Sequence, residues 1–102
     1  MSYPPPQPEH RLDQLRHLPM EPAEYCQRWV TAQPGKGYLK VCINALAEAT
    51  GLSPGTIKNW GSDFHRRPQY VLRLLRQADL LNQIKALEQA GHLAILQDAL
   101  RD

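Results

Sequence analysis

Residues 45–60 read ALAEATGLSPGTIKNW and predict two helices with almost no chain between them. Gly51 suits the end of the first helix, because glycine adopts the left-handed backbone conformation without a Cβ clash. Ser53 can cap the next helix with its hydroxyl, and Pro54 is favoured in a first helical turn. Since only Leu52 separates Gly51 from Ser53, the two short helices must meet at a steep angle.

The residues around this stretch predict further helices and no strand. Apolar residues recur at the spacing of a helix face in each flanking segment. Helices are predicted over about residues 9–18, 22–32, 38–50, 54–64 and 68–90, with a last short helix after Gly91. Met1–Pro8 reads MSYPPPQP, too rich in proline for regular structure, and is expected to be a disordered tail or a polyproline ligand.

The expected fold is therefore all-α, a compact bundle of about five helices with a long C-terminal helix. Three parts are predicted: a proline-rich tail over 1–8, a helical domain over 9–81 and a C-terminal helical segment over 82–102.

The composition is that of a soluble domain: 42% of the 102 residues are hydrophobic and 22% are charged. No apolar run approaches the length of a membrane span, and the N-terminus lacks a secretion pattern. We therefore expect a cytoplasmic protein. Cys26 and Cys42 do not have the spacing of a metal or redox motif, so both are expected to be reduced and buried.

Positive charge is concentrated around the quoted stretch. Residues 36–76 hold seven Lys or Arg against two acids, whereas residues 1–35 and 77–102 are both net negative. A local basic region of this kind is what a phosphate-bearing partner requires.

The central residues resemble the helix-turn-helix family of DNA-binding proteins, in particular its lambda-repressor-like (XRE-like) branch. The family pattern has a small residue, a glycine four positions later and a branched aliphatic six beyond that, here Ala47, Gly51 and Ile57. Leu46, Leu52 and Trp60 occupy the flanking apolar positions.

The segment His65–Leu81 is similar to the loop and fourth helix of that family, so the resemblance covers about residues 22–81. It implies a first helix over about 38–50, a turn over 51–53 and a recognition helix over about 54–64. The recognition helix is then expected to enter the major groove of duplex DNA.

The side chains expected to contact bases are Thr56, Lys58 and Asn59, because lysine can donate to guanine and asparagine can pair with adenine. Phosphate contacts are expected from residues in and around the two helices. These residues are Ser53, Ser62, His65, Arg66, Arg67, Lys36 and Lys40. For Ser53, a purely structural role as helix cap is an equally good reading.

The predicted long helix has apolar residues on two sides. One side should cover the core and carries Val71, Leu74, Leu75, Ala78 and Leu81. Other apolar residues fall on the opposite side or beyond Gly91 and are expected to form a homodimer interface, although a monomeric fold-back remains open. These residues are Leu80, Ile84, Leu87, Leu93, Leu96 and Leu100.

The sequence favours a small DNA-binding transcriptional regulator that acts as a homodimer. The alternative is a protein-interaction module that keeps the helix-turn-helix shape and docks through its C-terminal helices. The low net charge and Gly55, which offers no side chain for readout, favour this alternative. No catalytic motif or metal-ligand spacing is present in the sequence, so no enzymatic activity, metal or cofactor is expected.

Overall fold

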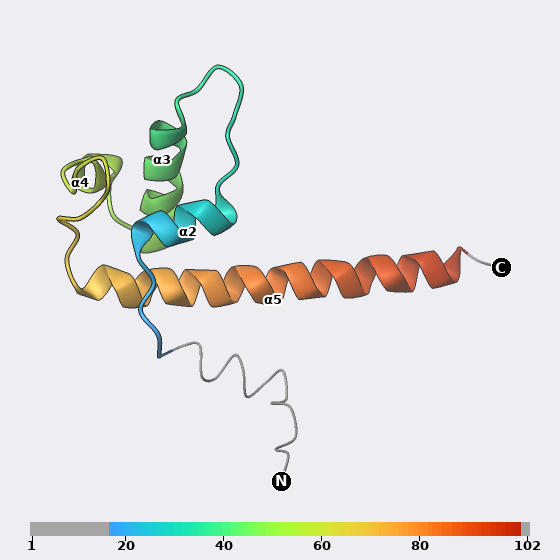
Figure 1. Cartoon of the computed structure of the whole chain (residues 1–102). Coiled ribbons are helices and arrows are strands. Elements are labelled where there is room, and N and C mark those ends of the chain that lie inside the picture. Colours follow the sequence, from blue (N-terminus) through green and yellow to red (C-terminus); the bar gives the residue numbers. More distant parts are fainter. Residues whose placement is uncertain (1–16, 101–102) are drawn as a thin grey trace, which may run out of the picture.

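The computed structural model describes residues 17–100, and within this range the chain forms four α-helices and no strand. The helices are α2 (Pro22–Trp29), α3 (Tyr38–Thr50), α4 (Pro54–Lys58) and α5 (Tyr70–Ala99). Figure 1 shows α2, α3 and α4 on one side of the first half of α5, whose second half continues beyond them as a straight rod. The predictions of an all-helical chain and of a long C-terminal helix are confirmed.

The prediction of a compact bundle of five helices is correct only in part. The other helices pack on one side of the first half of α5 only (Figure 1). The tail predicted over 1–8 lies outside the described residues, as does most of the helix predicted over 9–18; His17 and Leu18, at its end, are not helical. The boundary predicted between 9–81 and 82–102 falls inside α5.

The hydrophobic core forms where the faces of α2, α3, α4 and α5 meet. Leu46, Ile57 and Leu75 are fully buried there and come from three different helices. The buried residues of this core cluster are Met20, Tyr25, Cys26, Cys42, Leu46, Ile57, Trp60, Phe64, Val71 and Leu75. Leu81, predicted on the core side of α5, is instead 57% exposed.

A buried carboxylate joins α2 to α5. Asp79 is fully buried, and each of its two oxygens accepts two hydrogen bonds. Oδ1 accepts from the Arg28 guanidinium at 2.9 Å and from the Trp29 indole at 2.8 Å. Oδ2 accepts from Arg76 at 2.8 Å and from Gln83 at 2.9 Å. Because every lone pair has a donor, the charge is tolerated in the interior.

The same network fixes the chain that enters α2. The guanidinium of Arg76, which is 5% exposed, also donates to the backbone carbonyls of Leu18 at 3.0 Å and Pro19 at 3.3 Å. Burial pushes the pKa of Asp79 up, but hydrogen bonds from the indole and the two guanidinium groups outweigh burial, so the net pKa is lowered. Asp79 is therefore an anion at neutral pH.

Cys26 of α2 and Cys42 of α3 are buried free thiols, as the sequence predicts. Burial raises the pKa of Cys26 far above its usual range, and the neighbouring Cys42 thiol raises it further. Both residues serve as small apolar core residues.

The helix predicted over 54–64 is wrong in its second half, because α4 ends at Lys58. The backbone then tightens into turns in which the N–H groups of Trp60 and Gly61 donate to the carbonyls three residues earlier. Gly61 has φ +94°, a value that does not continue a helix. The chain turns here in a way that buries the Trp60 side chain, which is 4% exposed.

The helix end predicted at Ala90–Gly91 is also wrong, because α5 runs from Tyr70 to Ala99 without a break. Replacing alanine with glycine inside a helix lowers the stability of the helix by about 1 kcal/mol. This penalty alone does not end a long helix. The neighbouring Ala and Leu residues are strong helix formers and carry the helix through. Among residues 17–100, no helix is long and apolar enough to cross a membrane.

Candidate nucleic-acid interface

The turn between α3 and α4 is built by local hydrogen bonds. Gly51 has φ +78°, and its N–H donates to the carbonyl of Ala47 at 2.9 Å. The hydroxyl of Thr50 donates to the carbonyl of Leu46 at 2.7 Å and accepts from the N–H of Leu52 at 3.2 Å. These bonds end α3 and redirect the chain within three residues.

Helix α4 crosses α3 steeply, as the short turn requires. Figure 1 views α4 nearly along its axis while α3 runs across the view. The inner side of α4 is fixed by Ile57, which is fully buried, and by Trp60 just beyond it. Thr56, Lys58 and Asn59, the three side chains predicted to contact bases, are all exposed.

Ser53 caps α4, the structural role that the sequence left open. Its Oγ accepts from the backbone N–H of Thr56 at 3.1 Å and lies 2.9 Å from the hydroxyl of Thr56. One hydroxyl of the pair donates to the other, so one hydroxyl hydrogen stays available for a phosphate oxygen. The Ser53–Thr56 pair can therefore cap the helix and still donate one hydrogen bond to a phosphate.

The loop between α4 and α5 turns its basic residues outward. Phe64 has φ +60°, an uncommon value for a bulky side chain, and is 5% exposed. Burying this ring in the core leaves the flanking His65 and Arg66 exposed. Ser62, predicted within the recognition helix, is an exposed residue of this loop.

Two of the three consecutive basic residues of this loop are paired with acids. His65 contacts the carboxylate of Asp63 through Nδ1, and this hydrogen bond lowers the pKa of Asp63. Arg67 holds both oxygens of Glu21 in a bidentate pair at 2.7 and 3.0 Å, and this bond lowers the pKa of Glu21 against a smaller opposing effect of burial. The side chain of Arg66 makes no ion pair within residues 17–100.

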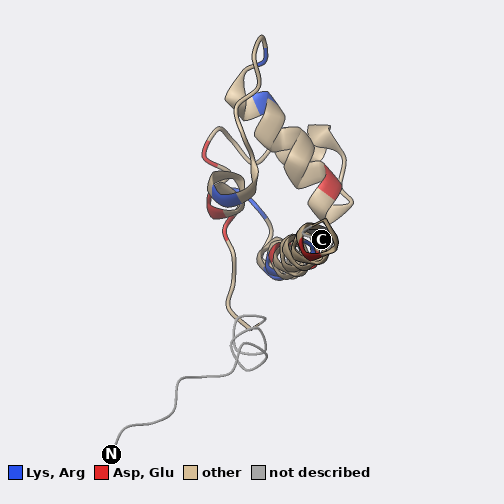
Figure 2. Cartoon of the chain, turned by 90° about the vertical axis from the view of Figure 1, so that its right-hand side faces the viewer, with Lys and Arg blue, Asp and Glu red and all other residues tan. Residues whose placement is uncertain are grey.

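Lys36 and Lys40 lie at the end of α3 that is remote from the turn. Lys36 is in the exposed loop before the helix and Lys40 is in its first turn. Figure 2 shows blue segments at the end of α3 and in the loop before it, and a red segment at the other end of this helix, where Glu48 lies in the last turn. Both lysines are exposed.

The basic charge of residues 36–76 is less available than the sequence predicts. Arg76 is buried against Asp79, and Arg67 is bound to Glu21. Exposed basic side chains without a described ion pair remain at Lys36, Lys40, Lys58, Arg66 and Arg73. The exposed charge is thus smaller than the residue count predicts, and it is divided between the start of α3, the α4 region and α5.

Sequence reasoning missed Asp79 and Arg73. Asp79 lies three residues after Arg76 on the apolar side of α5, and a charged pair in an apolar stripe is the signal that predicts a buried ion pair. Arg73 is exposed on a different side of α5. Within residues 17–100, no group of three His, Cys, Asp or Glu side chains is arranged to hold a metal.

The dimer residues predicted on α5 divide by exposure. Leu80 is half-buried, whereas Ile84 is 42% exposed and Leu87 is 65% exposed. Leu100 directly follows α5 and is 84% exposed. The side chains of Leu93 and Leu96 lie outside the described part of the structure.

Comparisons of this chain with protein-family models, with curated proteins and with solved structures found no match. The resemblance to the lambda-repressor-like helix-turn-helix branch therefore stays a prediction from the residues quoted for it.

Proposed function

We propose that this chain is a cytoplasmic regulator of transcription that binds duplex DNA through α4 and acts as a homodimer. It is a binding protein rather than an enzyme. Its outer α4 face enters the major groove, where Lys58 and Asn59 contact base edges and Thr56 assists. Arg66, Ser53 and the lysines at the start of α3 contact phosphates.

One observation carries this proposal. Ile57 and Trp60 hold α4 from inside, and every polar side chain of α4 is left exposed on its outer side. Helix α4 is packed against the core on one side and presents hydrogen-bond donors on the other, and the exposed Arg66 follows it. This is the geometry that a helix in the major groove needs. The ion pairs of His65 and Arg67 make them weaker candidates for phosphate contacts than Arg66.

Arg66 provides the test of the phosphate contacts. We expect Arg66→Ala to weaken binding to all duplexes to a similar extent and to reduce the slope of log affinity against log salt by about 1 per protomer. Fluorescence anisotropy with labelled duplex at several salt concentrations measures both. Lys85→Ala removes an equal charge from the middle of α5 and should leave the slope unchanged. Equal slopes for wild type and Arg66→Ala would remove the loop from the interface.

Lys58 and Asn59 provide the test of base readout. We expect Lys58→Ala or Asn59→Ala to relax the preference at one base pair by about 1–3 kcal/mol while affinity for random duplex changes less. Selection of bound duplexes from a random pool measures this preference position by position. If every base preference survives both substitutions, α4 is not the reading helix.

A protein-interaction module is the second candidate, favoured by the apolar exposure of Leu81, Ile84 and Leu87 on α5. The two functions predict different behaviour on an immobilised random duplex. A phosphate-driven protein is retained at low salt and released steeply as salt rises past roughly 0.15 M, where charges are screened beyond about 8 Å. A protein that is not retained at low salt belongs to the second class.

A further inference from the structure

One side of α5 that the bundle does not cover carries three large apolar residues in succession, Leu80, Ile84 and Leu87. Positions spaced alternately by four and three residues fall on one seam of a helix. On α5 this seam consists of Arg73, Gln77, Leu80, Ile84, Leu87, Gly91, Ala94 and Asp98. The bundle covers a different side, where Leu75 and Asp79 are fully buried. Seven of the eight seam residues are exposed, and Leu80 is half-buried, so most of the seam is open.

We propose that the partner of this seam is α5 of a second copy, running antiparallel, with the dyad midway between Lys85 and Ala86. This arrangement deepens the homodimer of the proposed function and rests on it. The alternating spacing reads the same in both directions, so a reversed copy can align all eight positions. Arg73 then faces the partner's Asp98, and Asp98 faces the partner's Arg73.

Charge selects this orientation. Arg73 and Asp98 are both exposed, and neither makes an ion pair within the described residues. In the antiparallel dimer the Arg73–Asp98 pair forms twice, once at each end of the seam. In a parallel pair, Arg73 faces a second Arg73 and Asp98 a second Asp98, and like charges in contact are unfavourable.

The sizes of the seam side chains also favour the antiparallel orientation. The antiparallel register places Ile84 against the partner's Leu87 at the centre and Leu80 against the partner's Gly91. A Cβ added at Gly91 would meet nothing within 4 Å in its own chain, so the fold of one copy does not require glycine there. Opposite Leu80, the missing side chain leaves room for a bulky neighbour. A parallel pair would instead set glycine against glycine and leave a gap.

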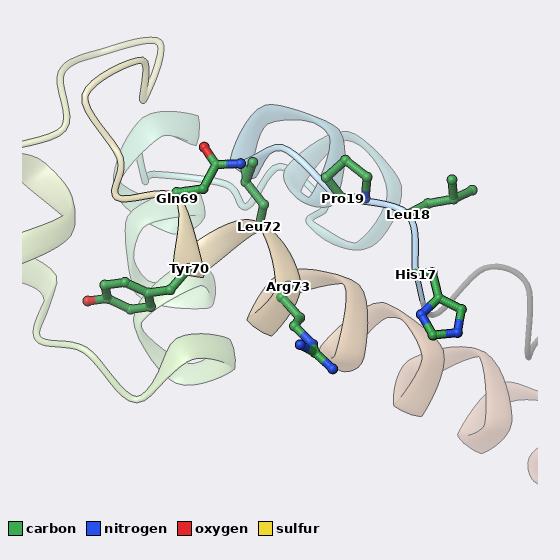
Figure 3. A pocket seen from close by; sticks show the side chains of 7 residues that line it. All are labelled: His17, Leu18, Pro19, Gln69, Tyr70, Leu72 and Arg73. Atoms are coloured by element: carbon green, nitrogen blue, oxygen red, sulfur yellow. The ribbon is translucent and has the colours of Figure 1, made fainter.

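A groove lies beside the seam, and the antiparallel arrangement needs such a groove to accept the partner helix. A groove of about 590 Å³ follows α5 and is lined by His17, Arg73, Gln77, Leu80, Leu81 and Ile84. Figure 3 shows the neighbouring pocket at the start of α5, which shares His17 and Arg73 with this groove, and Arg73 projects outward there from the first turns of α5. The second half of the partner's α5 carries its smallest seam residues, Gly91 and Ala94, and these would lie along the groove.

Sedimentation velocity of the full-length chain without DNA tests the interface. We expect a reversible dimer that Leu87→Asp dissociates, with an unchanged circular dichroism spectrum because Leu87 is 65% exposed. Arg73→Asp and Asp98→Arg should each raise the dimer Kd by about tenfold, because each loses two ion pairs and gains two like-charge contacts. The double variant Arg73→Asp/Asp98→Arg should return the Kd to within about threefold of wild type. Glu24→Arg on α2 matches the charge change of Asp98→Arg and should leave Kd unchanged.

Two outcomes would overturn the interface. A chain that stays monomeric up to roughly 100 μM leaves the groove to another occupant, either the chain's own residues 1–16 or a different protein. A dimer that responds to neither charge reversal, or is not rescued by the double variant, is parallel or uses another surface. Since no DNA is present, failure of the interface is distinct from failure of the proposed function. A monomer that binds DNA in a salt-dependent way would contradict the proposed interface. A dimer without affinity for DNA would contradict the proposed DNA-binding function.

Discussion

Replacing Asp79 with alanine is expected to lower the free energy of unfolding by about 3–5 kcal/mol, the range for removing one partner of a buried ion pair. The loss is large because the carboxylate serves four donors, of which the Arg76 guanidinium is almost completely buried. Without Asp79 this cation stays in the interior without its counter-ion, and the Trp29 indole loses its acceptor. Urea denaturation followed by far-UV circular dichroism measures the change.

Arg28→Ala is the matched control for this prediction. Arg28 donates to the same carboxylate at 2.9 Å, but 46% of its side chain is exposed, so its charge is hydrated with or without the bond. We expect a loss of about 1 kcal/mol or less. Equal losses for Asp79→Ala and Arg28→Ala would show that the carboxylate is not an essential part of the interior.

The second large effect is expected at Ile57, the residue that anchors α4. Ile57→Ala should destabilise the fold by about 2–5 kcal/mol, because a fully buried side chain leaves a cavity between α3 and α4. The same variant should bind duplex DNA more weakly at temperatures where it stays folded, since α4 loses its inner contact. Thermal denaturation and anisotropy on one preparation measure both effects.

Leu39→Ala controls for the loss of an aliphatic side chain in the same helix pair. Leu39 is in the first turn of α3 and is 44% exposed, so its truncation should cost less than about 1 kcal/mol. If Ile57→Ala costs no more than Leu39→Ala, α4 is held by other contacts and the outer-face assignment loses its support.

The sequence predicts α3 and the turn well because their causes are local. The backbone at residue 51 is left-handed, a conformation that glycine adopts easily. The hydrogen-bond partners that complete the turn lie within four positions of Gly51. The end of α4 is different: it depends on burial of Trp60 against helices that are distant in sequence. Gly91 shows the same limit in reverse, because a local helix-breaking signal is overruled by the helix-forming residues on both sides.

The exposed polar side of α4 could also be predicted from local spacing. The pairing of the basic residues could not, because Glu21 meets Arg67 across 46 positions and is brought there by the packing of α2. Asp79 joins Trp29 and Arg28 across a similar separation. Charge counted along a sequence therefore overestimates the charge available to a partner whenever the fold supplies internal counter-ions.

The two thiols between α2 and α3 give the chain an internal reporter. The thiolate is the form of cysteine that attacks an alkylating reagent, and burial both keeps the pKa of Cys26 high and excludes the reagent. Modification of Cys26 or Cys42 must wait for α2 to separate from α3. The alkylation rate of the protein thus measures how often α2 and α3 separate, and it requires no engineered label.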